Sequence, residues 1–337
     1  MERVAYIIGE TFLYWNSIIL LLAVLTAIFT FLAFYLSRGK NGIRAAVIVP
    51  VSMVLSVVLS RLVHWYCRVD AYESMEAAMT EFIGGGYALM GVFAGCLLTA
   101  CLLRMVRIIN NLPQTLDCMA LGAGAGICVG RLACFFTSAD RGMIVEGVRS
   151  LPWVYTVNNA VTGALEWRLA TFMIQSLCAG GIFLAMAVFY CLGQRRNRRV
   201  KDGDTALLFM ACYCATQVVL DSTRYDSLFL RSNGFISVVQ ILSAVVMGVV
   251  LIILSVRMVR ATGFKWRYVG VWVLYAALLG GAGFMEYWVQ RNGNQALFSY
   301  SVMSVCLVGM VAVTWVVWSI AAKGERLGIR GRKTEES

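Results

Sequence analysis

An arginine lies inside an apolar, glycine-rich run of this sequence. Arg131 occurs in "GAGICVGRLACFFTSADRG", residues 124–142. In a membrane, such a guanidinium either extends to the membrane–water interface or faces a polar pocket within the protein. Its planar fork of N–H donors matches the oxygens of a phosphate. Arg61, in "VVLSRLVHWYC", repeats the pattern. The two arginines predict a binding site for the head group of an anionic lipid.

Further polar side chains share single helical faces. Gln217, Asp221 and Arg224 in "ATQVVLDSTRYDS" are spaced i, i+4 and i+7, so they form one stripe. Asp221 and Arg224 can pair within their own helix, and this self-contained pair is the alternative to a role in a site. Gln240 and Ser243 in "SVVQILSAV" form a similar pair one turn apart.

Other chemistries have little support in the sequence. The only histidine, His64, borders two aromatic residues, so an interfacial aromatic belt is the alternative to a catalytic role. Eleven cysteines include no C-x-x-C pair, which favours small apolar fillers over a metal or redox site. No nucleotide-binding, hydrolase or metalloprotease motif occurs. We therefore expect no cofactor and no metal.

The elements that position these residues are apolar helices. The chain of 337 residues is 60% hydrophobic and 14% charged, which indicates an all-α polytopic membrane protein. The net charge of +11 would suit nucleic acid, but the basic residues lie in short loops between spans, so no nucleic-acid partner is expected. Apolar runs predict helices at about 12–37, 43–67, 82–103, 116–137, 168–193, 204–224, 233–256, 268–289 and 297–322.

The loops between these helices alternate in charge. Most of the 29 basic residues lie in alternate loops and in the C-terminal tail "KGERLGIRGRK". By the positive-inside rule these segments are cytoplasmic, so the N-terminus is expected outside and the C-terminus inside. The longest outer loop is expected at about 138–167.

Two helical faces consist of small residues. Gly122, Gly126 and Gly130 recur every fourth residue, and Gly91 and Gly95 do the same on another span. Such stripes let two helices pack backbone to backbone. The alternatives are tight packing alone, or packing that leaves a cavity beside Arg131.

These motifs together resemble a known family. "VGRLACFFTSADRG" is similar to the G-R-x-G-N-F-x-N-x-E signature of bacterial prolipoprotein diacylglyceryl transferase. "SRLVHWY", "GGYALMGVFAG", "VVLDSTR" and "GFISVVQILS" resemble further family segments in the same order. The resemblance covers about residues 12–256 and implies a seven-helix core with its N-terminus outside. It predicts a transferase-like membrane domain (1–256), two additional transmembrane helices (257–322) and a basic cytoplasmic tail (323–337).

The resemblance also implies a reaction. The family, which resides in the bacterial cytoplasmic membrane, transfers diacylglycerol from phosphatidylglycerol to the thiol of a lipobox cysteine in a preprolipoprotein. Such a step needs a thiolate and positive charge near the departing glycerol phosphate. Arg131 matches the family's phosphatidylglycerol-binding arginine. The other residues implied to bind substrate are Arg61, Arg224, Gln240, Gln217 and Ser243.

The chain departs from the family pattern at several positions. Met90 stands in place of a histidine, Cys134 of an asparagine and Ala139 of a glutamate, while Gln217 replaces an arginine and Asp221 a glutamate. "RLATFMIQ" replaces the family's H-P-S-Q-L-Y-E segment.

Because methionine cannot accept a proton, the base of a transferase would have to be Asp221, Asp140 or His64. Two hypotheses follow. The chain is a divergent diacylglyceryl transferase, or it is a non-catalytic membrane paralogue that binds a phospholipid or a partner. A transporter or another head-group transferase is a weaker alternative, and the absence of an evident internal repeat argues against transport.

Overall fold

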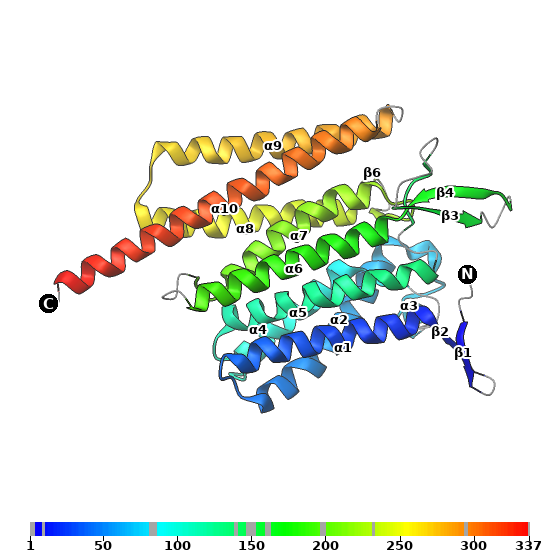
Figure 1. Ribbon diagram of the computed structural model, residues 1–337, viewed down its shortest axis with the longest axis horizontal. Helices are drawn as coiled ribbons and strands as arrows, with labels where there is room; N and C mark the ends of the chain where they lie inside the picture. Colours follow the sequence, from blue (N-terminus) through cyan, green and yellow to red (C-terminus); the bar gives the residue numbers. More distant parts are fainter. Residues whose placement is uncertain are drawn as a thin grey trace.

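The structure is a computed structural model that describes residues 4–8, 11–80, 86–137, 141–145, 153–158, 163–195, 200–230, 233–292 and 296–335. Its long helices lie roughly side by side in one bundle (Figure 1). They are α1 (Trp15–Ser37), α2 (Gly42–Cys67), α4 (Leu89–Met105), α5 (Leu112–Leu132), α6 (Thr171–Arg195), α7 (Asp204–Ser222), α8 (Val238–Thr262), α9 (Trp266–Arg291) and α10 (Ala296–Glu335). Eight are long and apolar enough to cross a membrane, and α4 is a shorter apolar helix. The prediction of an all-α polytopic membrane protein is confirmed.

Short elements at one end of the bundle were not predicted. Three antiparallel hairpins pair β1 (Val4–Ile8) with β2 (Thr11–Tyr14), β3 (Val154–Asn158) with β4 (Leu165–Leu169), and β5 (Phe229–Leu230) with β6 (Asn233–Ser237). Two 3-10 helices, η1 (Val69–Ala71) and η2 (Ala133–Phe136), and the short α3 (Met75–Thr80) complete this end. Figure 1 shows the hairpins on the right; we call this the hairpin end.

Several predicted helix boundaries were therefore wrong. Residues 12–14, 168–169 and 233–237, expected to open helices, belong to strands. Helix α4 begins at Leu89, and residues 86–88 before it are not helical. Helix α10 continues beyond residue 322 to Glu335, so most of the expected basic tail is helical.

The glycine stripes bring helix pairs into backbone contact. A Cβ atom built on Gly95 of α4 would lie 2.5 Å from the Cα of Ser56 in α2, and one on Gly122 of α5 would lie 2.8 Å from the carbonyl oxygen of Ala27 in α1. Real Cβ atoms do not approach so closely, so only glycine allows these separations. The predicted close packing is confirmed for both stripes.

Substituting one of these glycines tests the packing. We expect Gly95→Val to force α2 and α4 apart and to destabilise the protein by about 1–3 kcal/mol or more. Gly248→Val in α8 is the matched control, because a Cβ there would meet nothing within 4 Å. Thermal unfolding in detergent, followed by tryptophan fluorescence, measures both. Equal midpoints for the two variants would contradict the packing argument.

Helices α9 and α10 form an antiparallel pair, and α10 packs along α7 and α8 (Figure 1). A buried carboxylate joins this pair to the rest of the bundle. Asp204, at the start of α7, accepts hydrogen bonds from Nη1 of Arg257 in α8 (2.6 Å) and from Nε1 of Trp318 in α10 (2.8 Å). Lys201 and Arg257 also pair with Glu325 of α10, at 2.9 and 3.6 Å. These contacts tie the last helix to α7 and α8.

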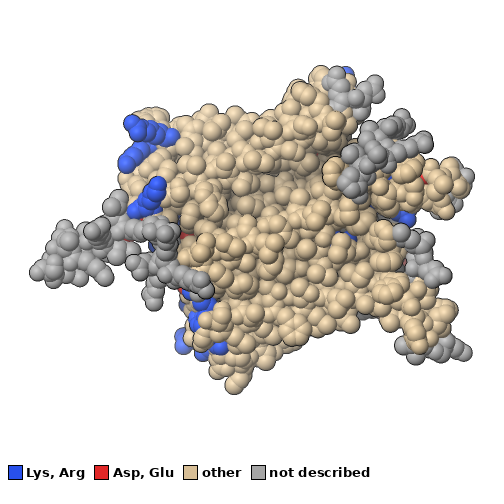
Figure 2. Space-filling view, in the orientation of Figure 1, with Lys and Arg blue, Asp and Glu red and all other residues tan. Residues whose placement is uncertain are grey.

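Charge distinguishes the two ends of the bundle. Figure 2 shows lysine and arginine side chains gathered at the end opposite the hairpins, where the C-terminus also lies in Figure 1. Arg38, Lys40, Arg107 and Lys265 lie in the connections between helices at this end, and Arg104 lies in the last turn of α4. We call it the basic end.

Candidate functional site

Arg61 is held by the protein itself near the hairpin end. It is 2% exposed. Its Nη1 donates to the carbonyl oxygen of Gly86 (3.1 Å) and to the hydroxyl of Tyr72 (3.4 Å), and its guanidinium lies over the rings of Tyr72 and Tyr87. The same Tyr72 hydroxyl lies 2.9 Å from Nδ1 of His64. Arg61 therefore contacts a hydrogen-bonded pair of Tyr72 and His64. His64 has a polar partner as well as aromatic neighbours.

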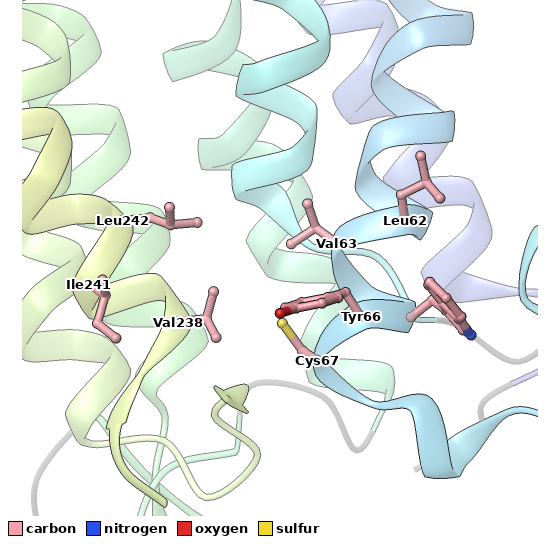
Figure 3. A pocket seen from close by; sticks show the side chains of 8 residues that line it. Leu62, Val63, Tyr66, Cys67, Val238, Ile241 and Leu242 are labelled. Atoms are coloured by element: carbon pink, nitrogen blue, oxygen red, sulfur yellow. The ribbon is translucent and has the colours of Figure 1, made fainter. Parts of the chain in front are cut away.

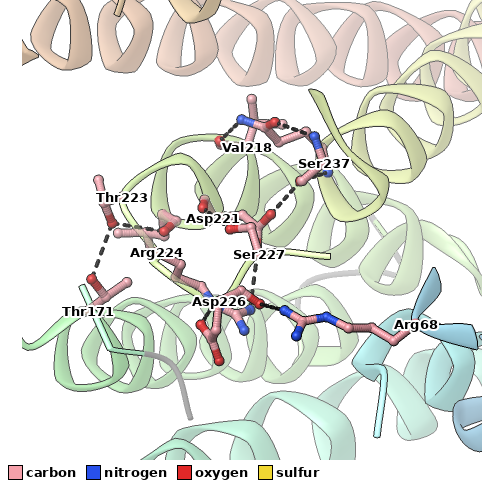
Figure 4. A network of polar contacts seen from close by, with 11 residues as sticks. Arg68, Thr171, Val218, Asp221, Thr223, Arg224, Asp226, Ser227 and Ser237 are labelled. Atoms are coloured by element: carbon pink, nitrogen blue, oxygen red, sulfur yellow. Dashed lines mark hydrogen bonds and ion pairs between the residues drawn. The ribbon is translucent and has the colours of Figure 1, made fainter. Parts of the chain in front are cut away.

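Asp221 and Arg224 pair with each other, as the sequence allowed as an alternative, although α7 ends at Ser222 and Arg224 lies two residues beyond it. Asp221 is fully buried, and its Oδ1 lies 3.1 Å from Nη1 of Arg224. The hydroxyl of Ser237 donates to the other carboxylate oxygen, and Nε of Arg224 pairs with Asp226 at 3.1 Å (Figure 4). Both oxygens of Asp221 are thus engaged, so this carboxylate is a poor proton acceptor.

Breaking this pair should cost stability. We expect Asp221→Ala to lower the free energy of unfolding by about 3 kcal/mol, because it removes the fully buried carboxylate that pairs with Arg224 and accepts from the buried hydroxyl of Ser237. Asp226→Ala is the matched control: it removes the second carboxylate on the same arginine, but its side chain is 30% exposed, so we expect less than about 1 kcal/mol. Chemical denaturation in detergent measures both. An equal loss in the two variants would refute a special role for Asp221.

Gln240 and Ser243 have structural contacts. Ser237 and Gln240 form a capping box at the start of α8, and Nε2 of Gln240 donates to the carbonyl oxygen of Val218 (3.1 Å). Ser243 is fully buried beside the thiol of Cys214, between α7 and α8. The structure places neither side chain beside Arg131.

Two buried amides lie at one depth on neighbouring helices. Gln217 of α7 is 2% exposed and Gln175 of α6 is 1% exposed. A contact of 3.2 Å between the hydroxyls of Thr171 and Thr223 joins the start of α6 to the end of α7, and each amide lies within about two turns of it. Nε2 of Gln217 and both amide atoms of Gln175 have no hydrogen-bond partner in the described residues. Buried polar groups are normally satisfied, so these amides indicate a place for a ligand or water.

Arg131 lies at the same depth. It is half-buried in the last turn of α5, which η2 continues. Phe135 of η2 contacts Phe172 of α6, with ring centroids 6.0 Å apart, so Arg131 and Gln175 are both within about a turn of this contact. Arg131, Gln175 and Gln217 together are called the polar layer below.

Met90 of α4 lies at about the depth of the polar layer. The ring of Phe93, one turn further along α4, contacts Tyr213, which lies one turn from Gln217. Met90 is 9% exposed. A thioether thus occupies a buried position at the depth of two amides and an arginine, and it can neither donate nor accept a proton there.

An apolar groove opens between α2 and α8 at the hairpin end. It encloses about 490 Å³ and is lined by Leu62, Val63, Trp65, Tyr66, Cys67, Val238, Ile241 and Leu242. Figure 3 shows side chains of the two helices facing each other across it. Next to it, Nη2 of Arg68 donates to the carbonyl oxygen of Asp226 (3.4 Å), which connects the end of α2 to the Arg224 network (Figure 4). The groove has the lining that a lipid acyl chain requires.

Two residues from the sequence argument lie outside the described residues, namely Asp140 and Ala139. In the described part of the chain, no three His, Cys, Asp or Glu side chains group in a way that could hold a metal ion. The amide of Gln175 was missed by sequence reasoning. Its only signal is the one amide side chain in the largely apolar run "RLATFMIQSLCAG".

The fold and site define a polytopic membrane protein with arginines and buried amides near one end of its helices. The prolipoprotein diacylglyceryl transferase family model matches residues 3–256, and the chain belongs to this family. It is a multi-pass protein of the bacterial cytoplasmic membrane. Helix α9 and helix α10 lie beyond the matched residues.

Curated relatives carry the same description. The phosphatidylglycerol–prolipoprotein diacylglyceryl transferase of Clostridioides difficile (strain 630) is 23% identical over 74% of this chain and 96% of its own length. The proteins of that name from Streptococcus suis (strain 05ZYH33) and Streptococcus agalactiae serotype V are 24% and 25% identical, over 74% and 73% of this chain and 92% and 95% of their own lengths.

Proposed function

We propose that the protein transfers diacylglycerol from phosphatidylglycerol to a lipobox cysteine thiol of a preprolipoprotein. Family membership and the names of its relatives support this reaction. The observation that carries it is the polar layer, where Arg131 and the amides of Gln175 and Gln217 lie at one depth near the hairpin end. An arginine with buried amide groups suits a phosphate that bears a hydroxylated head group.

We also infer the orientation and the division of the chain. The basic end is cytoplasmic by the positive-inside rule, which puts the hairpin end and the N-terminus outside. Residues 1–256 form the transferase-like domain and residues 257–322 the added helices. The extension at 323–337 lies on the cytoplasmic side.

Each part of the site then has one task. The thiolate sulfur of the acceptor cysteine forms a bond to the terminal glycerol carbon of the diacylglyceryl group, while the bond from that carbon to the phosphate oxygen breaks. Glycerol phosphate departs with the electron pair. Arg131 stabilises the charge on the departing phosphate, and Gln175 and Gln217 hydrogen-bond the head group. The groove between α2 and α8 takes an acyl chain.

We infer that His64 is the proton acceptor, by elimination of the other described candidates. Asp221 is engaged by Arg224 and Ser237, and Met90 has no basic atom. The Nδ1 atom of His64 is held by Tyr72, which fixes the imidazole ring, and no described residue is hydrogen-bonded to its Nε2. In the tautomer whose Nδ1–H donates to the Tyr72 hydroxyl, Nε2 is available to take the thiol proton.

A second function is a phospholipid-binding paralogue without turnover. It is favoured by Met90, which puts a thioether at the depth of the polar layer. Such a protein retains the phosphate site and the acyl-chain groove but performs no transfer.

One assay separates the two functions. The purified protein is placed in vesicles that contain phosphatidylglycerol, together with a lipobox peptide, and the thioether product is followed by mass spectrometry. An active transferase from the same family runs alongside as a control. Thioether product supports the transferase. Phosphatidylglycerol binding that Arg131→Ala weakens, without product, supports the paralogue. A protein that neither binds the lipid nor forms product refutes both.

A further inference from the structure

The hairpin of β3 and β4 belongs to a small sheet above the polar layer. The segment 141–145 is hydrogen-bonded to β4: the amide of Gly142 donates to Leu169 (3.1 Å), and that of Val145 donates to Trp167 (2.8 Å). On its other side the amide of Met143 donates to Thr223 (2.9 Å). The order across the sheet is therefore 223–225, 141–145, β4, β3.

Strand β3 is the edge of this sheet. Trp167 and Leu169 of β4 form their backbone hydrogen bonds with the segment 141–145. Because bonding directions alternate along a strand, the backbone groups of Arg168, between them, face β3. The amide of Ala170 donates to the carbonyl oxygen of Trp153 (2.7 Å), so Ala170 also bonds toward β3, in agreement with this alternation. With Tyr155 opposite Arg168, the backbone groups of Tyr155 and Val157 face β4.

The alternate residues of β3 point their backbone groups away from the sheet. These are Val154, Thr156 and Asn158. None of them has a backbone hydrogen bond to another described residue, and Thr156 and Asn158 are exposed. Such a row of free donors and acceptors is a template for one more strand.

Side-chain contacts hold β4, the partner of the edge strand, against its neighbours. The guanidinium of Arg168 forms two hydrogen bonds to Glu166 (2.7 and 2.9 Å), donates to the carbonyl oxygen of Gly142 (3.2 Å) and lies over the ring of Tyr225. These contacts fix β4 against the segment that carries Arg224. A template for a peptide has to be preorganised in this way to bind at low entropic cost.

An aromatic floor leads from β3 to the end of α5. The ring of Tyr155 packs on Phe172 (5.6 Å between centroids), and Phe172 contacts Phe135, one turn beyond Arg131. Burial raises the pKa of Tyr155 above its ordinary value, in keeping with an apolar setting. An added strand would place alternate side chains on this floor, which favours apolar residues there.

We propose that the outer edge of β3 binds an extended, apolar peptide segment as an added strand. This rests on the proposed function, so the occupant is the lipobox region of a preprolipoprotein. Strand addition uses backbone groups for affinity and apolar contacts for selection, which suits a substrate that varies in sequence. The edge is continuous, through Phe172 and Phe135, with the helix end that carries Arg131.

A backbone-specific probe tests the added strand. Lipobox peptides with a single N-methyl group, moved one residue at a time, are titrated against the full-length protein in phosphatidylglycerol nanodiscs. We expect methylation at every second residue to weaken binding about tenfold or more, and methylation between them to have less than about a threefold effect. Uniform sensitivity, insensitivity at every position, or no binding of the unmethylated peptide would overturn the proposal.

A pair of variants tests the same edge from the protein side. Thr156→Pro removes an outward N–H and leaves the bonds between β3 and β4 in place, whereas Thr156→Ala keeps the N–H. We expect only Thr156→Pro to weaken peptide binding, by about tenfold or more, with unchanged phosphatidylglycerol binding as the sign of a folded protein. Equal peptide binding by both variants, or a dimer that Thr156→Pro abolishes, would overturn the proposal. If Thr156→Pro does not fold, the titration with N-methylated peptides alone tests the proposal.

The test separates this proposal from the proposed function. Peptide binding is measured without turnover, so alternating sensitivity with no thioether product supports the added strand and rejects the transferase. Thioether product together with peptide binding that does not alternate in its sensitivity to N-methylation supports the transferase and rejects the added strand.

Discussion

Replacing Arg131 with alanine is expected to lower the rate of thioether formation by about 100-fold to 1,000-fold. The guanidinium is the positive group of the polar layer, and removing one preorganised donor to developing negative charge typically has an effect of this size. Arg131→Lys should recover part of the loss, because it restores the charge but not the two-pronged geometry. Initial rates with a lipobox peptide at saturating phosphatidylglycerol measure both variants.

The control for this variant removes a positive charge from the same end of the bundle. Arg68 is exposed and donates only at 3.4 Å to the carbonyl oxygen of Asp226. We expect Arg68→Ala to change the rate less than about threefold, because exposed charges are screened. Similar losses for Arg131→Ala and Arg68→Ala would show that net charge, and not the polar layer, binds the phospholipid.

Replacing His64 with glutamine should lower turnover by about 100-fold to 10,000-fold, the usual contribution of a general base. Phosphatidylglycerol binding should be unchanged, because His64 contacts Tyr72 and not the polar layer. Since a protonated imidazole cannot accept a proton, the wild-type rate should also fall as the pH is lowered through the titration of this histidine.

Tyr72→Phe is a milder variant against which the loss of rate in His64→Gln can be compared. It keeps the aromatic ring beneath Arg61 but removes the hydroxyl that holds Nδ1 of His64, so a smaller loss, about tenfold, is expected. Rates followed across pH, with lipid binding measured in parallel, check both variants. Full activity of His64→Gln would assign the proton transfer to another group.

The helices could be predicted because all but one of them, α4, are apolar runs long enough to span a membrane. The hairpins could not. Residues 153–158, "WVYTVN", were expected to belong to an outer loop, whereas the residues just before α6 and α8 are apolar enough to extend a helical pattern. Only their pairing partners make these segments strands. Pairing is a non-local property, so a pattern within one segment does not reveal it.

The site was predicted in part. The pairing of Asp221 with Arg224 follows from helical spacing alone. Gln240 was given a substrate role by resemblance, whereas its capping role could have been read from Ser237 three residues earlier. Gln175 and the order that Arg61 imposes on Tyr72 depend on contacts between helices, which no single segment encodes.

The indole of Trp318 has a consequence for how this chain could have diverged. It donates to Asp204, a carboxylate with no exposed surface, and Glu325 of the same helix pairs with Arg257. A shortened descendant that ended after α8 would lose both contacts and expose the apolar flank of α7 and α8 to lipid. The ion pair between Asp204 and Arg257 would remain, but Asp204 would lose its indole donor and Arg257 its second carboxylate. We therefore expect a chain cut after α8 to be less stable than the full chain.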